Sequence, residues 1–242
     1  MTETIIEKRA RLLGPNFSTF YKNPVHIVRG EGVWLWDNDG EKYLDCYNNV
    51  PHVGHCHPHV VEAITKQAKL LNTHTRYLHE GILDYVERLI SKHHEGIESA
   101  IMVCSGSEAN DIALRMAEAQ TGKKGIIVTD STYHGNTSAV SQLSYGRNAI
   151  GGVGDHIRYV RTPNSLSDYK ENSVSEAEHF AQNVKLAIGS LEESGHGVSA
   201  LLICPYFANE GFPTLEYGFL DKAVRQVRSA GGIVIADEVQ PG

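Results

Sequence analysis

The sequence contains no apolar run that approaches the roughly 18 residues needed to cross a membrane, and no long run of lysine and arginine. Its 22 Lys and Arg stand against 29 Asp and Glu, which gives a formal net charge of −7. This acidic balance argues against a protein that binds nucleic acid or a membrane surface. The opening residues, MTETIIEKRARLLG, lack the apolar core of a signal peptide, so we expect a cytoplasmic protein.

Cysteine is scarce, and several nucleotide-binding signatures are missing. The four cysteines, Cys46, Cys56, Cys104 and Cys204, are scattered, which fits reduced thiols better than a disulfide framework. The pattern G-x-x-x-x-G-K-[ST] is absent, and no G-x-G-x-x-G follows an early strand. These absences argue against a phosphate-loop nucleotidase and a dinucleotide-binding oxidoreductase. Hydrophobic residues make up 41% of the 242 residues, enough to bury a sizeable core.

The N-terminal part of the chain reads as a short helix followed by three short strands. Apolar residues recur around positions 26–28, 33–36 and 43–46, and Asn38-Asp39-Gly40 is a hairpin turn signal. This pattern predicts a small antiparallel meander within residues 1–57.

From Pro58 onward, helical periodicity alternates with short apolar runs. The predicted helices are 59–71, 82–94, 108–120, 175–193 and 219–229, and the predicted strands are 100–104, 125–129, 157–160, 199–204 and 232–236. Runs such as Ile126-Ile127-Val128 do not alternate with polar residues, so both faces of these strands are buried. We therefore expect an α/β fold in which residues 58–242 form a mostly parallel sheet with helices on both faces.

Ligands of such sheets bind where the strands end, so the residues after each predicted strand are the candidate site. Ser105-Gly106-Ser107-Glu108-Ala109-Asn110 follows the first strand as a small-residue turn that opens a helix. Free N–H groups and the helix dipole favour an anion there, typically a phosphate. An ordinary helix cap, with Ser107 as the N-cap, explains the same residues without a ligand.

Two further strand ends carry residues that suit a planar, nitrogen-containing ligand. Tyr133-His134-Gly135 can cover the face of a ring, although a turn with packed side chains is the simpler interpretation. Asp237 and Glu238 follow the last strand, and buried acids are costly unless each has a partner. Asp237 is suited to pair with a cationic ring nitrogen, and a helix cap is the alternative. A magnesium-binding pair like that of a phosphate-loop nucleotidase is excluded, because G-x-x-x-x-G-K-[ST] is absent.

Histidines gather between His52 and His59 and resemble metal ligands at first sight. Pro58 breaks any regular ligand spacing, and no second Cys/His pair completes a set. We therefore expect no metal site, and interpret the segment as a tight turn in which Pro58 opens the next helix.

Together, a phosphate cradle, an aromatic ring cover and an acid for a ring nitrogen describe a site for pyridoxal phosphate. The chain resembles the N-terminal part of the class III aminotransferases, within the fold-type-I pyridoxal-phosphate enzymes. The resemblance covers residues 20–242 and rests on the motifs GVWLWDNDG (32–40), YLD (43–45), GHCHP (54–58), SGSEAN (105–110), YHG (133–135) and ADEVQ (236–240). The segments 45–50 and 72–79 are most similar to the branch of ethanolamine-phosphate phospho-lyases and alanine–glyoxylate aminotransferase-like proteins.

The resemblance implies a role for each matched residue on the phosphate side of the cofactor. Gly106 and Ser107 would bind the phosphate group. Tyr133 would stack on the pyridine ring, and His134 and Gly135 would shape its loop.

It also implies roles around the ring and the substrate. Asp237 would pair with the ring nitrogen, Val239 would press on the other ring face, and Gln240 would lie by the ring hydroxyl. Glu210 matches an active-site glutamate of several members. Asp237 and Glu210 are thus the expected catalytic residues of this chain.

The chain departs from the family pattern in two places. Where the family usually has Val-Glu-Pro, it has Ile203-Cys204-Pro205, which puts the usual amine substrates in doubt. The family's Schiff-base lysine follows the 236–240 motif, whereas the last lysine here is Lys222. We therefore expect a truncated large domain, with residues 1–57 contributing to the small domain.

By resemblance, the expected function is transfer of an amino group from an amine or amino acid to a keto acid, in a homodimer. A phospho-lyase that acts on a phosphorylated amino alcohol stays open, because it uses the same cofactor chemistry. A catalytically incomplete chain that serves as a binding or assembly module also stays open, because the lysine is missing.

Overall fold

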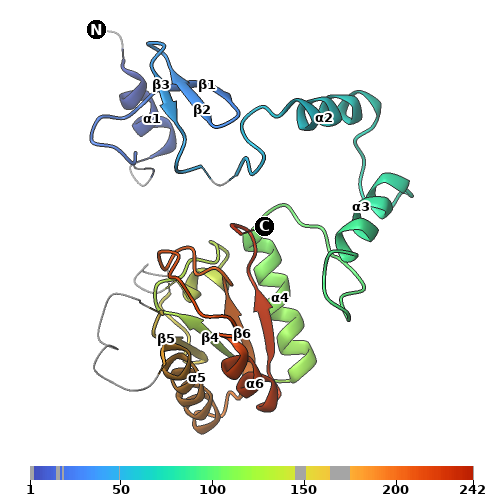
Figure 1. Ribbon diagram of the computed structural model, residues 1–242, viewed down its shortest axis with the longest axis vertical. Coiled ribbons are helices and arrows are strands. Elements are labelled where there is room, and N and C mark those ends of the chain that lie inside the picture. Colours follow the sequence, from blue (N-terminus) through green and yellow to red (C-terminus); the bar gives the residue numbers. More distant parts are fainter. Residues whose placement is uncertain are drawn as a thin grey trace. The chain divides into compact units, whose positions relative to one another are not determined.

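The computed structural model describes residues 3–14, 17, 19–48, 50–144, 151–163 and 175–241. It contains two compact units, residues 1–81 and residues 82–242, which are described separately below (Figure 1). The expected boundary after residue 57 stays a prediction.

The first unit begins with helix α1 (Ile5–Leu13), which starts at a capping box formed by Thr4 and Glu7. The predicted meander follows as β1 (Ile27–Glu31), β2 (Trp34–Asp37) and β3 (Lys42–Leu44), paired antiparallel in that order. The turn between β2 and β3 is organised by one carboxylate: Asp37 accepts hydrogen bonds from the amides of Asp39 and Glu41.

The histidine-rich segment is joined to this meander by a side-chain hydrogen bond and a backbone bridge. His55 Nε2 lies 2.6 Å from Asp45 Oδ2, and the backbones of Gly32 and His55 form an isolated antiparallel bridge. Pro58 then opens helix α2 (Pro58–Leu70), as expected for proline in a first turn. Within the described ranges, no three His, Cys, Asp or Glu side chains are grouped to hold a metal ion.

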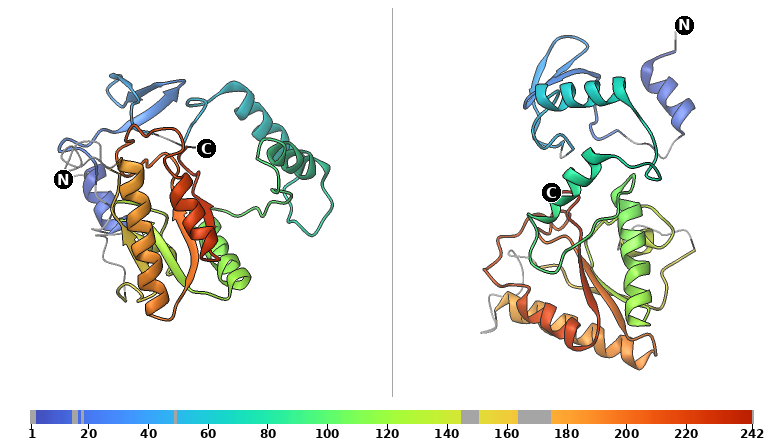
Figure 2. Two further views of the ribbon diagram at one scale, coloured as in Figure 1. Left: turned by 60° about the horizontal axis from the view of Figure 1, so that its bottom comes forward. Right: turned by 90° about the vertical axis from the view of Figure 1, so that its right-hand side faces the viewer.

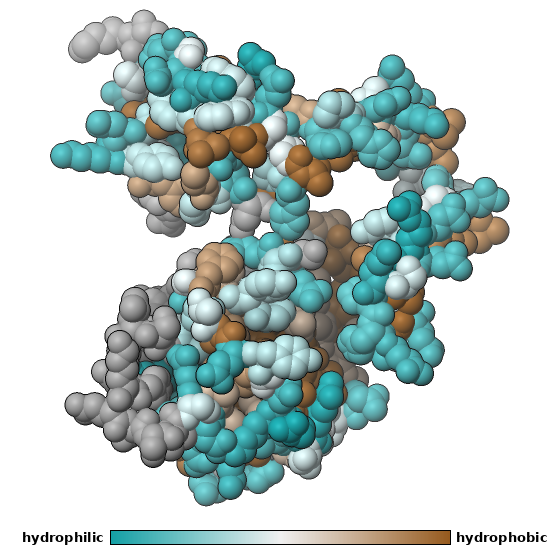
Figure 3. All heavy atoms as spheres, viewed as in Figure 1, coloured by the Kyte–Doolittle hydropathy of each residue, from teal (hydrophilic) through white to brown (hydrophobic). Residues whose placement is uncertain are grey.

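Helices α2 and α3 (Glu80–Ile90) contain no buried residue. Both are amphipathic, yet apolar side chains such as Ile64 and Leu83 are each 64% exposed. Figure 3 shows apolar surface over both helices.

No helix in the described part of the chain is long and apolar enough to cross a membrane.

The second unit is a four-stranded parallel sheet in the order β5-β4-β6-β7. Its strands are β4 (Gly125–Thr129), β5 (Ile157–Val160), β6 (Val198–Ile203) and β7 (Ile233–Ala236). Its helices are α4 (Gly106–Thr121), the short 3-10 helix η1 (Val140–Leu143), α5 (Glu176–Glu193) and α6 (Asp221–Ser229).

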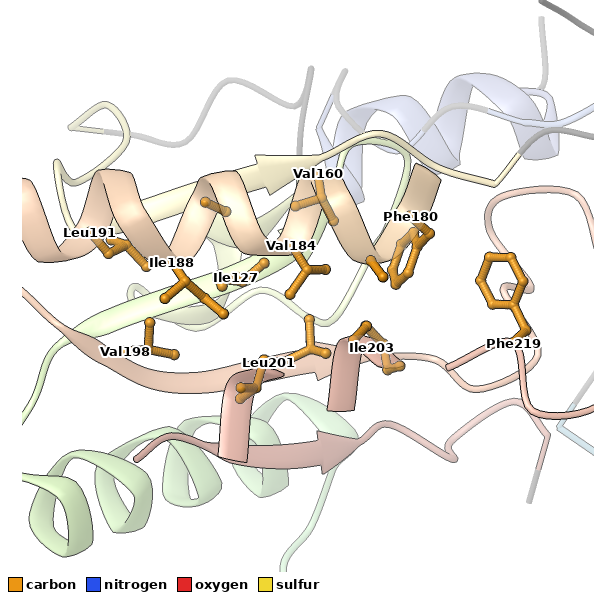
Figure 4. Packing of buried hydrophobic residues seen from close by; sticks show 14 of the residues in the cluster. Ile127, Val160, Phe180, Val184, Ile188, Leu191, Val198, Leu201, Ile203 and Phe219 are labelled. Carbon is orange, nitrogen blue, oxygen red and sulfur yellow. The ribbon is translucent and has the colours of Figure 1, made fainter. Parts of the chain in front are cut away.

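Side chains of successive strand residues pack on opposite faces of this sheet. Ile127 and Leu201 join the cluster of α5 and α6 on one face (Figure 4). Ile126, Val128 and Leu202 join Leu114 of α4 and the residues of η1 on the other. Figure 2 shows α5 and α6 together on one side of the strands and α4 on the other. The predicted α/β fold, with helices on both faces and a small antiparallel meander, is confirmed.

The strand predicted at residues 100–104 is wrong for this structure. Ile101 and Met102 belong to no helix or strand and are 62% and 47% exposed. A strand needs a neighbour for its N–H and C=O groups, and no described strand is paired with this segment. The apolar run at 100–104 predicted a buried strand, but among the described residues this segment is exposed and has no strand partner.

Candidate functional site

The loops that carry the predicted site residues leave the sheet at one edge. Parallel register sets Ile203 beside Ala236, so the carboxyl ends of β6 and β7 lie together. The loops 130–135 after β4, 204–210 after β6 and 237–240 after β7 all start from this edge, as a parallel sheet requires.

The N-terminus of α4 presents Ser107 to this edge. Ser105, not Ser107, is the N-cap: its Oγ accepts from the Glu108 amide at 3.3 Å, and the Glu108 carboxylate accepts from the Cys104 amide at 2.7 Å. The interpretation of Ser107 as the cap is therefore wrong. Its Oγ instead accepts from the Asn136 amide at 3.1 Å, which leaves the hydroxyl proton available to an acceptor.

Two glycines keep this helix start close to the neighbouring loops. A Cβ on Gly106 would lie 2.5 Å from Val239 Cγ2, and a Cβ on Gly135 would lie 2.4 Å from Ser107 Oγ. Gly135 also has φ 136°, which side chains disfavour. Only glycine therefore allows the loops after β4 and β7 to approach the first turn of α4 this closely.

Asp237 forms the centre of a buried hydrogen-bond cluster. It is 8% exposed, and its Oδ2 accepts from His134 Nδ1 at 2.7 Å and from Asn110 Nδ2 at 2.9 Å. Its Oδ1 accepts from the Val239 amide at 3.1 Å. On the far side of the imidazole, His134 Nε2 lies 3.0 Å from Thr132 Oγ1.

This environment keeps Asp237 ionised despite its burial. Burial by itself favours the neutral acid, but hydrogen bonds from His134, Asn110 and the Val239 amide outweigh it. The pKa of Asp237 is therefore lowered below its ordinary value. A buried carboxylate with a lowered pKa is the group needed to hold a cationic nitrogen.

The sequence pattern predicts the acid but not two other members of its hydrogen-bond cluster, Asn110, which donates to Asp237, and Thr132, which contacts His134. Asn110 stands in the SGSEAN motif and Thr132 precedes the YHG motif, and neither has a role in the sequence-based prediction. Both are buried polar residues, 5% and 2% exposed. The sequence assigns His134 only to the shape of a loop, whereas its ring donates directly to Asp237. Asn110 is a polar residue among the buried residues of α4. A polar residue on the face of a predicted helix that packs on the sheet is the feature by which the sequence could have indicated its role.

The remaining ring residues are more open. Tyr133 and Gln240 are partly buried, and Val239 is 63% exposed with its side chain against Gly106. The Tyr133 carbonyl accepts from Asn209 Nδ2 at 3.5 Å. An exposed apolar side chain and a half-buried aromatic ring beside a buried carboxylate suit a flat ligand.

Glu210 is held at the same edge of the sheet. One of its carboxylate oxygens, Oε1, accepts from the hydroxyl of Thr129, the last residue of β4. Its other oxygen, Oε2, is buried and has no hydrogen-bond partner among the described residues. Cys204, at the position where the family usually has glutamate, is 5% exposed at the end of β6.

Comparison with known proteins places the chain in a family. A sequence profile described as Aminotransferase class-III matches residues 18–242. An alanine–glyoxylate aminotransferase 2-like protein of Drosophila melanogaster is 36% identical over 249 residues, covering 100% of this chain and 50% of that protein.

Two solved structures share the fold. A phospholyase from Arthrobacter, in complex with phosphoethanolamine, has a TM-score of 0.92 and 41% identity, over 99% of this chain and 57% of that one. A taurine:2-oxoglutarate aminotransferase from Bifidobacterium kashiwanohense, in complex with pyridoxal phosphate and glutamate, has a TM-score of 0.81 over 100% of this chain and 57% of that one. At 22% identity, the second likeness concerns the fold alone.

The chain spans about half the length of the curated relatives it matches. The profile match nevertheless runs from residue 18 to residue 242, through the meander, the α4 turn and the Asp237 cluster. The chain therefore belongs to the class III aminotransferase family, as the motifs of its sequence predicted.

Proposed function

We propose that the protein containing this chain is a pyridoxal-phosphate enzyme that acts on primary amines. The observation that carries the proposal is the buried Asp237 carboxylate, held ionised by His134 and Asn110 at the carboxyl end of the sheet. The family uses this cofactor, and its ring nitrogen needs such an anion.

The residues of this chain fit the phosphate group of the cofactor. The first-turn amides of Gly106 and Ser107 have no partners inside α4, and the helix dipole favours an anion there. The Ser107 hydroxyl accepts from Asn136 and keeps its own proton to donate. We assign these groups to the phosphate, with Gly135 keeping the space around Ser107 open.

The residues around the ring fit as well. Asp237 would hold the ring nitrogen as a cation, with Tyr133 and Val239 against the two ring faces and Gln240 near the ring hydroxyl. When bound, pyridoxal phosphate supplies an electron sink that stabilises negative charge on the substrate carbon next to the amine. The Schiff-base lysine would lie in the part of the protein that this chain does not span.

One carboxylate oxygen of Glu210 is available to a ligand in this arrangement. Thr129 occupies Oε1, and the buried Oε2 has an open acceptor site. A buried carboxylate oxygen without a donor is costly, so a bound group that donates a hydrogen bond there gains affinity. We propose that Glu210 receives a donor of the substrate, such as its ammonium group.

Phosphate elimination from a phosphorylated amino alcohol is the reaction with the stronger support. The chain is 41% identical to a phospholyase solved with phosphoethanolamine. Cys204 also stands directly after β6 where the family usually has glutamate, and the absence of that carboxylate argues against the usual amine substrates of the family. The overall reaction consumes phosphoethanolamine and water and releases phosphate, ammonia and acetaldehyde.

Amino transfer to a keto acid is the second candidate. It is supported by the 36% identity to an alanine–glyoxylate aminotransferase 2-like protein. In this reaction the amine nitrogen passes to the keto acid and no phosphate is released. The two functions therefore differ in their need for a keto acid and in the release of phosphate.

The test uses the complete protein loaded with pyridoxal phosphate. Phosphate and ammonia released from phosphoethanolamine without any keto acid would establish the lyase. A new amino acid formed only when amine and keto acid are both present would establish the aminotransferase. Asp237→Ala should abolish either activity in a folded protein. Full turnover in that variant, or turnover without added cofactor in cofactor-stripped protein, would refute the proposal.

We also propose that the complete protein is a homodimer. The exposed apolar residues of the N-terminal unit, among them Val33 at 55% exposure, are candidates for coverage by a second copy. Sedimentation of the complete protein tests this, and a fully active monomer would contradict it.

A further inference from the structure

The two oxygens of Asp237 are not equivalent, and the difference depends on Asn110. Oδ2 accepts two hydrogen bonds, from His134 Nδ1 and from Asn110 Nδ2, whereas Oδ1 accepts one, from the Val239 amide. A carboxylate has about four lone-pair sites, two on each oxygen. Oδ2 is therefore filled, and Oδ1 has one site left.

Two hydrogen-bond acceptors determine the orientation of the Asn110 side chain. Its amide nitrogen donates one hydrogen to the His134 carbonyl at 2.9 Å and the other to Asp237 Oδ2 at 2.9 Å. Both neighbours are oxygen acceptors, so only the NH₂ end of the side chain fits between them. The residue is 5% exposed, so water cannot easily take over either bond.

We propose that Asn110 is a positioning residue that fills Oδ2 of Asp237 together with His134, so that Oδ1 is the oxygen that receives the cationic ring nitrogen of the cofactor. The inference rests on the proposed function, since it concerns the same cofactor. It adds Asn110, and the atom Oδ1 of Asp237, to the roles that the family motifs imply.

The consequence is electrostatic as well as geometric. Two donors on Oδ2 favour the ionised carboxylate, so the negative charge needed opposite the ring nitrogen is kept despite burial. Without Asn110, the buried Oδ2 would lose one donor, and Asp237 could turn either oxygen toward the ring. The cofactor should then be held less tightly through its ring nitrogen, while its phosphate contacts are unchanged.

The test compares two ligands in the complete protein after removal of its cofactor. One is pyridoxal phosphate, and the other is its deaza analogue, in which CH replaces the ring nitrogen. Asn110→Ala should weaken binding of pyridoxal phosphate about ten-fold, as expected for a lost hydrogen bond to a charged group, and binding of the analogue less than about two-fold. Dissociation constants are measured by equilibrium titration.

Two further variants make the comparison specific. Asn183→Ala, on α5, is the matched control and should change neither dissociation constant. Asn110→Ser keeps one donor in a smaller side chain and should lie between wild type and alanine; it also serves if the alanine variant does not fold.

Equal weakening of both ligands by the Asn110 variants, or no weakening, would overturn the inference and assign Asn110 a purely structural role. The proposed function would fail in a different way. In that case the wild-type protein would bind pyridoxal phosphate no better than the deaza analogue, and Asp237→Ala would change neither affinity.

Discussion

His134 Nδ1 lies 2.7 Å from Oδ2 of Asp237, although 103 residues separate them in the sequence. Both side chains are buried, at 3% and 8% exposure. A carboxylate only accepts hydrogen bonds, so Nδ1 must carry the proton that joins the two groups. This contact ties the loop after β4 to the loop after β7 and orients the acid of the candidate site.

The first prediction concerns this pair. His134→Leu removes a donor from a buried carboxylate and should lower the free energy of unfolding by about 2 kcal/mol. His134→Asn places an amide donor near the position of Nδ1 and should recover part of that loss. Urea unfolding of the complete protein measures both variants. A leucine variant as stable as wild type would show that the pair contributes nothing to folding.

The second prediction separates the two serines at the start of α4. Ser105→Ala removes the N-cap and should lower the free energy of unfolding by about 1 kcal/mol, with little effect on cofactor affinity. Ser107→Ala removes a phosphate donor and should weaken binding of pyridoxal phosphate about ten-fold, with a smaller effect on unfolding. The reverse pattern would mean that Ser107, and not Ser105, caps the helix in solution.

The third prediction uses two helical glycines. A Cβ added to Gly189, inside α5, would have no neighbouring atom within 4 Å, so Gly189→Ala should stabilise the protein by about 1 kcal/mol. Gly106→Ala makes the same change in α4, but its Cβ would lie 2.5 Å from Val239 Cγ2. It should push the 237–240 loop away and weaken cofactor binding. Thermal unfolding and cofactor titration measure the two effects, and equal behaviour of both variants would contradict the close approach.

The fourth prediction concerns pH and the N-terminal unit. The Asn48 amide, followed by His55, holds the pKa of Asp45 well below its usual value. A lowered folded-state pKa stabilises the fold above the unfolded-state value near 3.8, and this contribution is lost as the pH falls further. The backbone bridge between Gly32 and His55 should therefore open more readily at pH 3 than at pH 5.

Hydrogen exchange at the Gly32 and His55 amides, corrected for intrinsic rates, measures this opening. Asp45→Asn should remove most of the pH dependence between these values. Asp39→Asn, an exposed acid in the neighbouring turn, is the control and should leave it in place. An unchanged pH dependence in the Asp45 variant would rule out this carboxylate as its source.

Much of the fold was predictable because buried strands have a characteristic apolar pattern in the sequence. The non-alternating run Ile126-Ile127-Val128 belongs to a strand buried on both faces, and it became β4, one of the two inner strands of the sheet. The exit of β7 into Asp237 was also readable, because a charged residue directly after an apolar strand marks the edge of a parallel sheet. Local pattern and burial therefore agree at β4, whereas β7 is only partly buried among the described residues.

The structure alone decided which side chains meet. The run at 100–104 has the same apolar character as β4, yet it forms no strand among the described residues, because pairing depends on a neighbour that no local pattern specifies. In the same way, the sequence determined that Asp237 follows an apolar strand and that Asn110 lies on a helix. Only the packing of α4 against the sheet brings Asn110, His134 and Asp237 within hydrogen-bonding distance, since hydrogen bonds depend on separation in space and not along the chain.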